Sequence, residues 1–151
     1  MSLSKLCLFT LAVILSGFAA VETLSVQIME YEVPTPNSRP HDPAIAPDGS
    51  LWYTGQAANK LGRLDPKTGE FKEYPLKTLN SGPHGLVADE EGNIWFTAIS
   101  GGYVGKLDPK TGEIAEYRPP AGTEIDPHTP RIRPERYFVV HQRRDELHRT
   151  S

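Results

Sequence analysis

The sequence has little cysteine, little excess charge and no long apolar run. Its single cysteine, Cys7, lies near the N-terminus, so the rest of the chain has neither disulfides nor thiol chemistry. A formal net charge of −3 gives no electrostatic reason to expect nucleic acid as a partner. The longest apolar run, from Leu6 to Ile14, is too short to span a bilayer comfortably. These shortages argue against a disulfide scaffold, a nucleic-acid-binding protein and a membrane-embedded protein.

The first 20 residues predict a secretory signal peptide. Lys5 supplies a positive region, the apolar run follows it, and Gly17 and Ala19 fit a cleavage rule of small residues. A membrane anchor is the alternative interpretation of the segment. We expect the protein to be exported, to a periplasm or into the medium, without membrane contact after cleavage.

What the sequence does contain is an internal repeat. His41 recurs as His84 and Trp52 recurs as Trp95, 43 residues later in both cases. A period of about 40 to 45 residues is typical of four-stranded propeller blades. A propeller needs roughly four or more blades to close its ring, so further blades are needed for closure. We therefore predict an all-β fold, a β-propeller truncated to about two blades plus an orphan outer strand.

Each repeat reads as four short strands, because runs of alternating apolar residues are separated by turn residues. The predicted strands cover 44–46, 51–54, 60–64 and 71–74, then 84–88, 94–97, 103–107 and 114–117. Residues 26–33 match a fourth strand without its first three, hence the orphan strand. The predicted organisation is a signal peptide (1–20), two repeats (about 30–74 and 74–117) with the start of a third (26–130 in all), and a non-homologous tail (131–151).

Several recurring residues have a structural interpretation. Trp52 and Trp95 fall at the same point of the second strand and are predicted to pack in the core between neighbouring sheets. Gly62 and Gly105 lie inside strands, where glycine indicates a bulge or a close backbone approach. Four aspartates fall in turns, where local backbone hydrogen bonding makes them poor catalytic candidates: Asp48, Asp65, Asp89 and Asp108.

His41, His84 and His128 are the candidate site residues. Each opens a first strand, and the first strands of a propeller line its central channel, so we predict a column of histidines at the channel mouth. Three interpretations stay open: the imidazoles satisfy backbone groups at blade edges, contact a small-molecule ligand, or hold a metal. We expect a ligand-binding role, assign no catalytic residue, and expect no metal or other cofactor in this chain.

Two sets of segments are similar to a known family. Pro34–His41 with Leu51–Thr54, and Gly82–Leu86 with Ile94–Thr97, resemble blades of virginiamycin B lyase, a streptogramin lyase. The resemblance covers roughly residues 30 to 130. It implies a seven-bladed ring and, in true streptogramin lyases, a magnesium-assisted elimination that linearises a cyclic depsipeptide antibiotic.

The resemblance also implies a histidine base at the channel mouth and a glutamate that holds the metal directly after the strand-two Trp-Phe-Thr motif. His41 and His84 match the histidine position, but Gly55 and Ala98 stand at the glutamate position. The family's catalytic blade comes later in the ring than the blades present here. Enzymatic activity is therefore left open, and we expect this chain to be an inactive fragment. Mg²⁺ is expected only in the intact parent protein. The alternative is a non-enzymatic scaffold that binds a ligand or a protein.

Residues 131–151 depart from the repeat and hold six of the nine arginines. A basic tail for nucleic acid or acidic membranes is one interpretation. However, synonymous codons for this segment, read one base later, can encode Ala-Phe-Asp-Pro-Asn-Gly-Ile-Leu-Trp-Phe-Thr-Asn. Its tryptophan falls eleven places after His128, as Trp95 does after His84. We predict that the tail is the next blade read in the wrong frame, after one extra base near codon 131.

Overall fold

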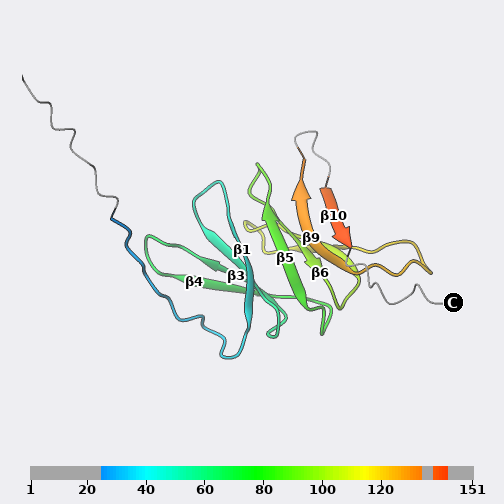
Figure 1. Ribbon diagram of the computed structural model, residues 1–151, viewed down its shortest axis with the longest axis horizontal. Helices are drawn as coiled ribbons and strands as arrows, with labels where there is room; N and C mark the ends of the chain where they lie inside the picture. Colours follow the sequence, from blue (N-terminus) through cyan, green and yellow to red (C-terminus); the bar gives the residue numbers. More distant parts are fainter. Residues whose placement is uncertain (1–24, 134–137, 143–151) are drawn as a thin grey trace, which may run out of the picture. The chain divides into compact units, whose positions relative to one another are not determined.

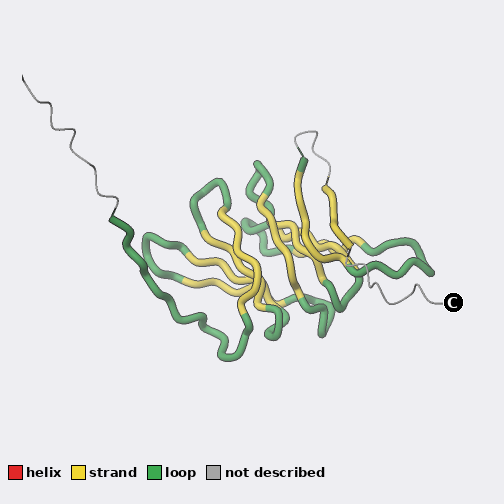
Figure 2. Tube along the Cα trace, viewed as in Figure 1, coloured by secondary structure: helices red, strands yellow, loops and turns green. Residues whose placement is uncertain are grey.

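The computed structural model describes residues 25–133 and 138–142. Within these ranges the chain forms ten β-strands and no helix (Figures 1 and 2). The described part accordingly contains no helix with the length and apolarity that a membrane crossing requires. The predicted signal peptide, residues 1–20, lies outside the described residues, as do parts of the predicted frameshifted tail.

Two four-stranded antiparallel sheets form the predicted blades, with the strands of each in chain order. The first blade consists of β1 (Pro40–Ile45), β2 (Leu51–Gly55), β3 (Lys60–Leu64) and β4 (Phe71–Pro75). The second consists of β5 (Pro83–Ala88), β6 (Ile94–Ala98), β7 (Tyr103–Leu107) and β8 (Ile114–Tyr117). The predicted strands agree with the structure to within one residue at each end, except that β1 begins four residues before its predicted start. Its register shifts between Pro40 and Pro43, which accommodates prolines that cannot donate to the ladder.

A third sheet contains two strands, β9 (Pro127–Ile132) and β10 (Phe138–Gln142). Val140 pairs with Pro130, just as Phe96 pairs with Leu86 in the second blade, 44 residues earlier on both strands. The strand pairing of a blade therefore continues past residue 130, where the sequence pattern stops. Backbone pairing does not depend on particular side chains, so the frameshift stays a prediction.

The turn between the third and fourth strands of each blade forms as its residues predict. Gly69 and Gly112 have φ of 76° and 78°, a left-handed conformation that glycine adopts without steric cost. The Asp65 carboxylate accepts a hydrogen bond from the backbone N–H of Lys67 at 2.9 Å. Asp48, Asp89 and Asp108 likewise accept local backbone hydrogen bonds, which confirms the interpretation of the turn aspartates.

One hydrophobic core spans both four-stranded sheets. Trp52 is only 1% exposed, as predicted for a core residue, and stacks on Tyr74 of its own sheet with ring centroids 5.4 Å apart. Trp95 is half-buried and packs between Tyr117 and Phe138, at 5.6 and 5.0 Å. The core joins these blade residues: Ala46, Trp52, Leu61, Tyr74, Leu76, Leu86, Ile94, Phe96, Ala98, Tyr103, Leu107 and Ile114.

The strand glycines make room for aromatic rings. A Cβ added at Gly62 would lie 1.9 Å from a ring carbon of Tyr53, its cross-strand partner. A Cβ at Gly105 would lie 2.0 Å from a ring carbon of Phe96. The register at both positions is regular, so the interpretation as a bulge or a close backbone approach is wrong. The close approach comes from a side chain on the neighbouring strand.

Residues 26–33, the predicted orphan strand, form none of the strands in the described part of the chain. A β-strand requires hydrogen bonds to a neighbouring strand. The predicted orphan strand is therefore not formed within the described residues.

Candidate functional site

The three histidines occupy equivalent places in three neighbouring strands. His41, His84 and His128 are the second residues of β1, β5 and β9, each directly after a proline. These strands lie side by side in Figure 1. The ring centroids of His41 and His84 are 4.1 Å apart, and those of His84 and His128 are 3.9 Å apart. The structure therefore brings the predicted column together as one imidazole stack.

Two buried threonines set the position of this stack. The hydroxyl of Thr54, at the end of the strand-two motif, donates a 2.7 Å hydrogen bond to the backbone carbonyl of His84 in the next blade. Thr97 donates an equivalent 2.7 Å bond to the carbonyl of His128. Both threonines are fully buried. Each hydroxyl thus joins one blade to the next at the residue that carries the imidazole.

The same hydroxyls also accept hydrogen bonds within their own blades. Thr54 accepts from the N–H of Asp42 at 3.2 Å, and Thr97 accepts from the N–H of Gly85 at 2.9 Å. The sequence analysis missed both threonines. Their signal was the third position of the recurring Trp-Tyr-Thr and Trp-Phe-Thr motif, which repeats as faithfully as the histidines.

The residue after each histidine determines the surroundings of its Nδ1 atom. His41 Nδ1 lies 2.8 Å from Oδ1 of Asp42, and His128 Nδ1 lies 3.1 Å from Oγ1 of Thr129. His84 is followed by glycine, which offers no side chain. Its Nδ1 is consequently buried without a hydrogen-bond partner.

Close packing excludes a side chain after His84. A Cβ at Gly85 would lie 2.3 Å from Cδ of Pro130 and 2.6 Å from the carbonyl oxygen of His128. A local partner for His84 Nδ1 therefore cannot be supplied without moving β9. The orphaned nitrogen is a consequence of how tightly the second and third sheets pack.

Burial also lowers the pKa of His84 below its usual value, because the charged imidazolium loses its hydration. Repulsion from His128 and His41 lowers it further, and Asp42 and Asp126 oppose these effects. His84 is only 7% exposed. At neutral pH its ring is neutral, so it can accept a proton or a hydrogen bond, or bind a metal ion.

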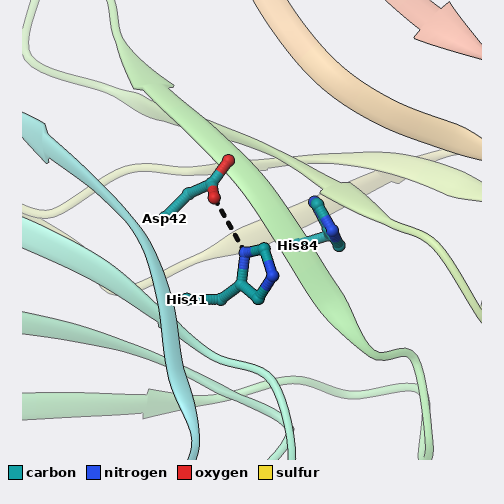
Figure 3. Close-up of side chains that lie close together, drawn as sticks. All are labelled: His41, Asp42 and His84. Atoms are coloured by element: carbon teal, nitrogen blue, oxygen red, sulfur yellow. Dashed lines mark hydrogen bonds and ion pairs between the residues drawn. The ribbon is translucent and has the colours of Figure 1, made fainter.

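Asp42 joins two of the histidines in a compact polar cluster. One ligand atom from each of His41, Asp42 and His84 lies within 4.8 Å of the others. Figure 3 shows the rings of His41 and His84 beside each other, with the Asp42 carboxylate over His41. Asp42 was not among the candidate site residues predicted from the sequence.

The two positions that correspond to the family's metal-holding glutamate do not fit Mg²⁺. Ala98 is fully buried, and a Cβ at Gly55 would lie 3.4 Å from the carbonyl oxygen of Lys60 and 3.7 Å from Cβ of Ser38. Both positions face packed protein and neither carries a carboxylate. Mg²⁺ binds through oxygen ligands in octahedral geometry. These blades therefore supply no magnesium site at that position, and the broader expectation of no cofactor stays a prediction.

Comparisons with known proteins agree with the all-β propeller fold. The virginiamycin B lyase family model matches residues 19–140. The selenomethionine-substituted virginiamycin B lyase from Staphylococcus aureus is 34% identical, with a TM-score of 0.70, over 76% of this chain and 38% of that one. A catalytically inactive histidine-to-alanine variant of the S. aureus lyase with quinupristin is 33% identical, with a TM-score of 0.71, over 78% and 39%.

A streptogramin B lyase structure is 36% identical, with a TM-score of 0.70, over 76% of this chain and 37% of that one. The chain thus spans less than two fifths of the length of these three structures. A comparison with curated proteins gives no match.

Proposed function

Because the chain belongs to the virginiamycin B lyase family of β-propellers, we propose that its histidine column forms part of a ligand-binding channel mouth in an exported propeller. The observation that carries this proposal is the stack of His41, His84 and His128. Thr54 and Thr97 fix the stack through buried hydrogen bonds between blades. Duplication alone would repeat the residues, but these bonds also fix the backbone of His84 and of His128.

The proposed ligand is a cyclic depsipeptide of the streptogramin type. The intact propeller would bind this ligand or linearise it by an elimination. The S. aureus relative with quinupristin is catalytically inactive when one histidine is replaced by alanine. An elimination requires a base, and the neutral imidazole of His84 is in the protonation state that a base requires. These points support a contact between the histidine column and the ligand.

The chain of 151 residues is itself inactive under this proposal. It lacks the carboxylate that the resemblance implies, because Gly55 and Ala98 stand at that position. It also covers only 37–39% of the solved lyases. The absent carboxylate favours a second candidate for these blades, a non-enzymatic scaffold that binds a ligand or a protein.

Turnover of quinupristin separates the two candidates. The chain as written and a version with the frame corrected after codon 131 and extended to the end of the shifted frame are incubated with quinupristin, with and without Mg²⁺. We expect no linear product from the chain as written and magnesium-dependent linear product from the extended protein. Binding without product supports the scaffold, and an extended protein that neither binds nor linearises quinupristin overturns the ligand-binding proposal.

Export is the second part of the proposal. The positive residue Lys5, the apolar run after it and the small residues Gly17 and Ala19 support a cleaved leader. Expression in a Gram-negative host, followed by N-terminal sequencing of the periplasmic fraction, tests this. We expect a mature N-terminus near residue 20, and an uncleaved cytoplasmic product contradicts export.

A further inference from the structure

We infer that His41, Asp42 and His84 form a binding site for a divalent transition-metal ion of the Zn²⁺ class, between the first strands of the first two blades. Their ligand atoms lie within 4.8 Å of one another. This inference does not rest on the proposed lyase function. It replaces the sequence-based expectation that the chain holds no metal.

The unpartnered nitrogen of His84 points to a ligand. His84 is 7% exposed, and its Nδ1 is buried without a hydrogen-bond partner. A buried polar atom without a partner is destabilising, so native structures seldom retain one unless another group satisfies it. Gly85 excludes a local side chain that would satisfy this atom. A cation bound to the His84 imidazole would satisfy this nitrogen, either directly or after the ring turns toward the cation.

The donors favour a transition metal over Mg²⁺. Two imidazoles and one carboxylate match the ligands preferred by Zn²⁺, Cu²⁺ and Ni²⁺, whereas Mg²⁺ and Ca²⁺ prefer oxygen ligands. Zinc–nitrogen bonds are about 2.0–2.1 Å and zinc sites are usually tetrahedral, so two ligands of one ion lie about 3.4 Å apart. The ligand atoms here lie within 4.8 Å of one another, so the side chains rotate inward when they bind an ion. Three protein ligands also leave a coordination position open to water or a ligand.

Asp42 distinguishes the first blade from the second at this site. It stands where the second blade has Gly85, and its Oδ1 lies 2.8 Å from Nδ1 of His41. The carboxylate contributes as a direct ligand or as the group that orients His41, a usual arrangement around metal-binding histidines. The repeat thus supplies both histidines, and a departure from the repeat supplies the negative charge.

The test uses the full chain carrying no polyhistidine tag, because added histidines bind the same ions. Titration calorimetry with ZnCl₂ and the visible absorption of bound Co²⁺ measure affinity and stoichiometry, and MgCl₂ serves as the comparison ion. We expect one Zn²⁺ per chain, a melting temperature raised by Zn²⁺ because the ion joins two blades, and no shift with Mg²⁺. Absence of saturable Zn²⁺ binding overturns the inference.

Variants identify the ligands. We expect His84→Ala and Asp42→Asn each to weaken Zn²⁺ binding by about tenfold or more and to change the Co²⁺ spectrum. Asp42→Asn preserves the size of the side chain, so it keeps the test decisive if His84→Ala fails to fold. Zn²⁺ binding that persists at full affinity in Asp42→Asn and in folded His84→Ala overturns the inference.

Two control variants address the other histidines. The double variant His141→Ala/His148→Ala removes both tail histidines, and His128→Ala removes the third member of the column. We expect each to bind Zn²⁺ as the unaltered chain does, because the ligand atoms that lie within 4.8 Å of one another belong to His41, Asp42 and His84. Loss of binding in the tail variant overturns the inference, and loss in folded His128→Ala overturns the assigned ligand set. Because these measurements require no turnover, their failure is distinguishable from failure of the lyase proposal.

Discussion

The hydroxyl of Thr54 donates a 2.7 Å hydrogen bond to the backbone carbonyl of His84, thirty residues along the chain and one blade away. The equivalent bond from Thr97 to His128 repeats this relationship at the next junction between sheets. The same hydrogen bonds therefore join neighbouring sheets and position the backbone of the histidines. A substitution that removes such a bond weakens the contact between the sheets and also frees the histidine.

Replacement of Thr54 by valine tests this coupling. Valine has nearly the same shape, but it leaves the N–H of Asp42 and the carbonyl of His84 without their shared partner. We expect Thr54→Val to lower the free energy of unfolding by about 1–3 kcal/mol, measured by urea denaturation. Thr68→Val is the matched control, because the Thr68 hydroxyl accepts an exposed hydrogen bond from the N–H of Glu70. Equal effects of the two substitutions would contradict the role of Thr54.

The strand glycines give a second prediction. Gly105→Ala places a Cβ 2.0 Å from a ring carbon of the buried Phe96, so the ring or the strand must move. We expect a loss of about 1–3 kcal/mol, the usual cost of overpacking a core. Gly55→Ala is the control, because its Cβ finds no neighbour closer than 3.4 Å. Thermal unfolding followed by circular dichroism measures both, and a Gly105→Ala protein as stable as the control would refute this account.

The repeat made the strands predictable, because turn residues and alternating apolar residues mark most of the strand boundaries in both blades. It also predicted the histidine column, since equivalent positions of successive blades lie side by side. The start of β1 was missed, because Pro40 and Pro43 interrupt the alternation that marks a strand. What strand periodicity cannot reveal is which atoms meet across neighbouring strands and blades.

Three features of the fold and the site depend on such contacts. The ring of Tyr53 over Gly62 follows from cross-strand register. The Nδ1 atom of His84 is buried without a hydrogen-bond partner because the next residue is glycine. Close packing of Gly85 against Pro130 leaves no room for a side chain there. The sequence pattern gives no sign that Asp42 differs from other acidic residues in loops. Asp42 lies close to His84 only because β1 packs beside β5.

Acid should destabilise the protein through Glu73. Burial raises the pKa of this carboxyl, but hydrogen bonds from Lys60 and Thr35 outweigh burial and hold the pKa below its usual value of about 4.5. The carboxylate therefore contributes stability at every pH above about 4.5, and this contribution is lost as the pH falls through the lowered folded-state pKa.

Glu73→Gln isolates this contribution. We expect the variant to be less stable than the unaltered chain by about 1 kcal/mol at pH 7, and the difference to shrink as the pH falls from 4.5 toward 3. Urea denaturation across this pH range measures it. A constant difference between the two proteins would show that the ionised carboxylate is not the source.

The last prediction concerns the third sheet and the reading frame. Val139 pairs with Arg131 as Trp95 pairs with Val87, so β10 occupies the position of a second strand with the expected register. In the shifted frame, a tryptophan replaces Val139 and a threonine replaces His141. The threonine then stands where Thr97 stands in the second blade, as the donor that would hold the next blade's first strand.

We therefore expect the gene's DNA to encode Trp-Phe-Thr in the shifted frame at these codons, followed by further repeats of the same period. Sequencing the gene from codon 128 through several hundred bases decides this, and a shifted frame without Trp-Phe-Thr refutes it. The frame-corrected, extended protein should also melt at a higher temperature, because further strands then cover β10 and the half-buried Trp95. An unchanged melting temperature would mean that the third sheet gains nothing from the blade that the repeat predicts.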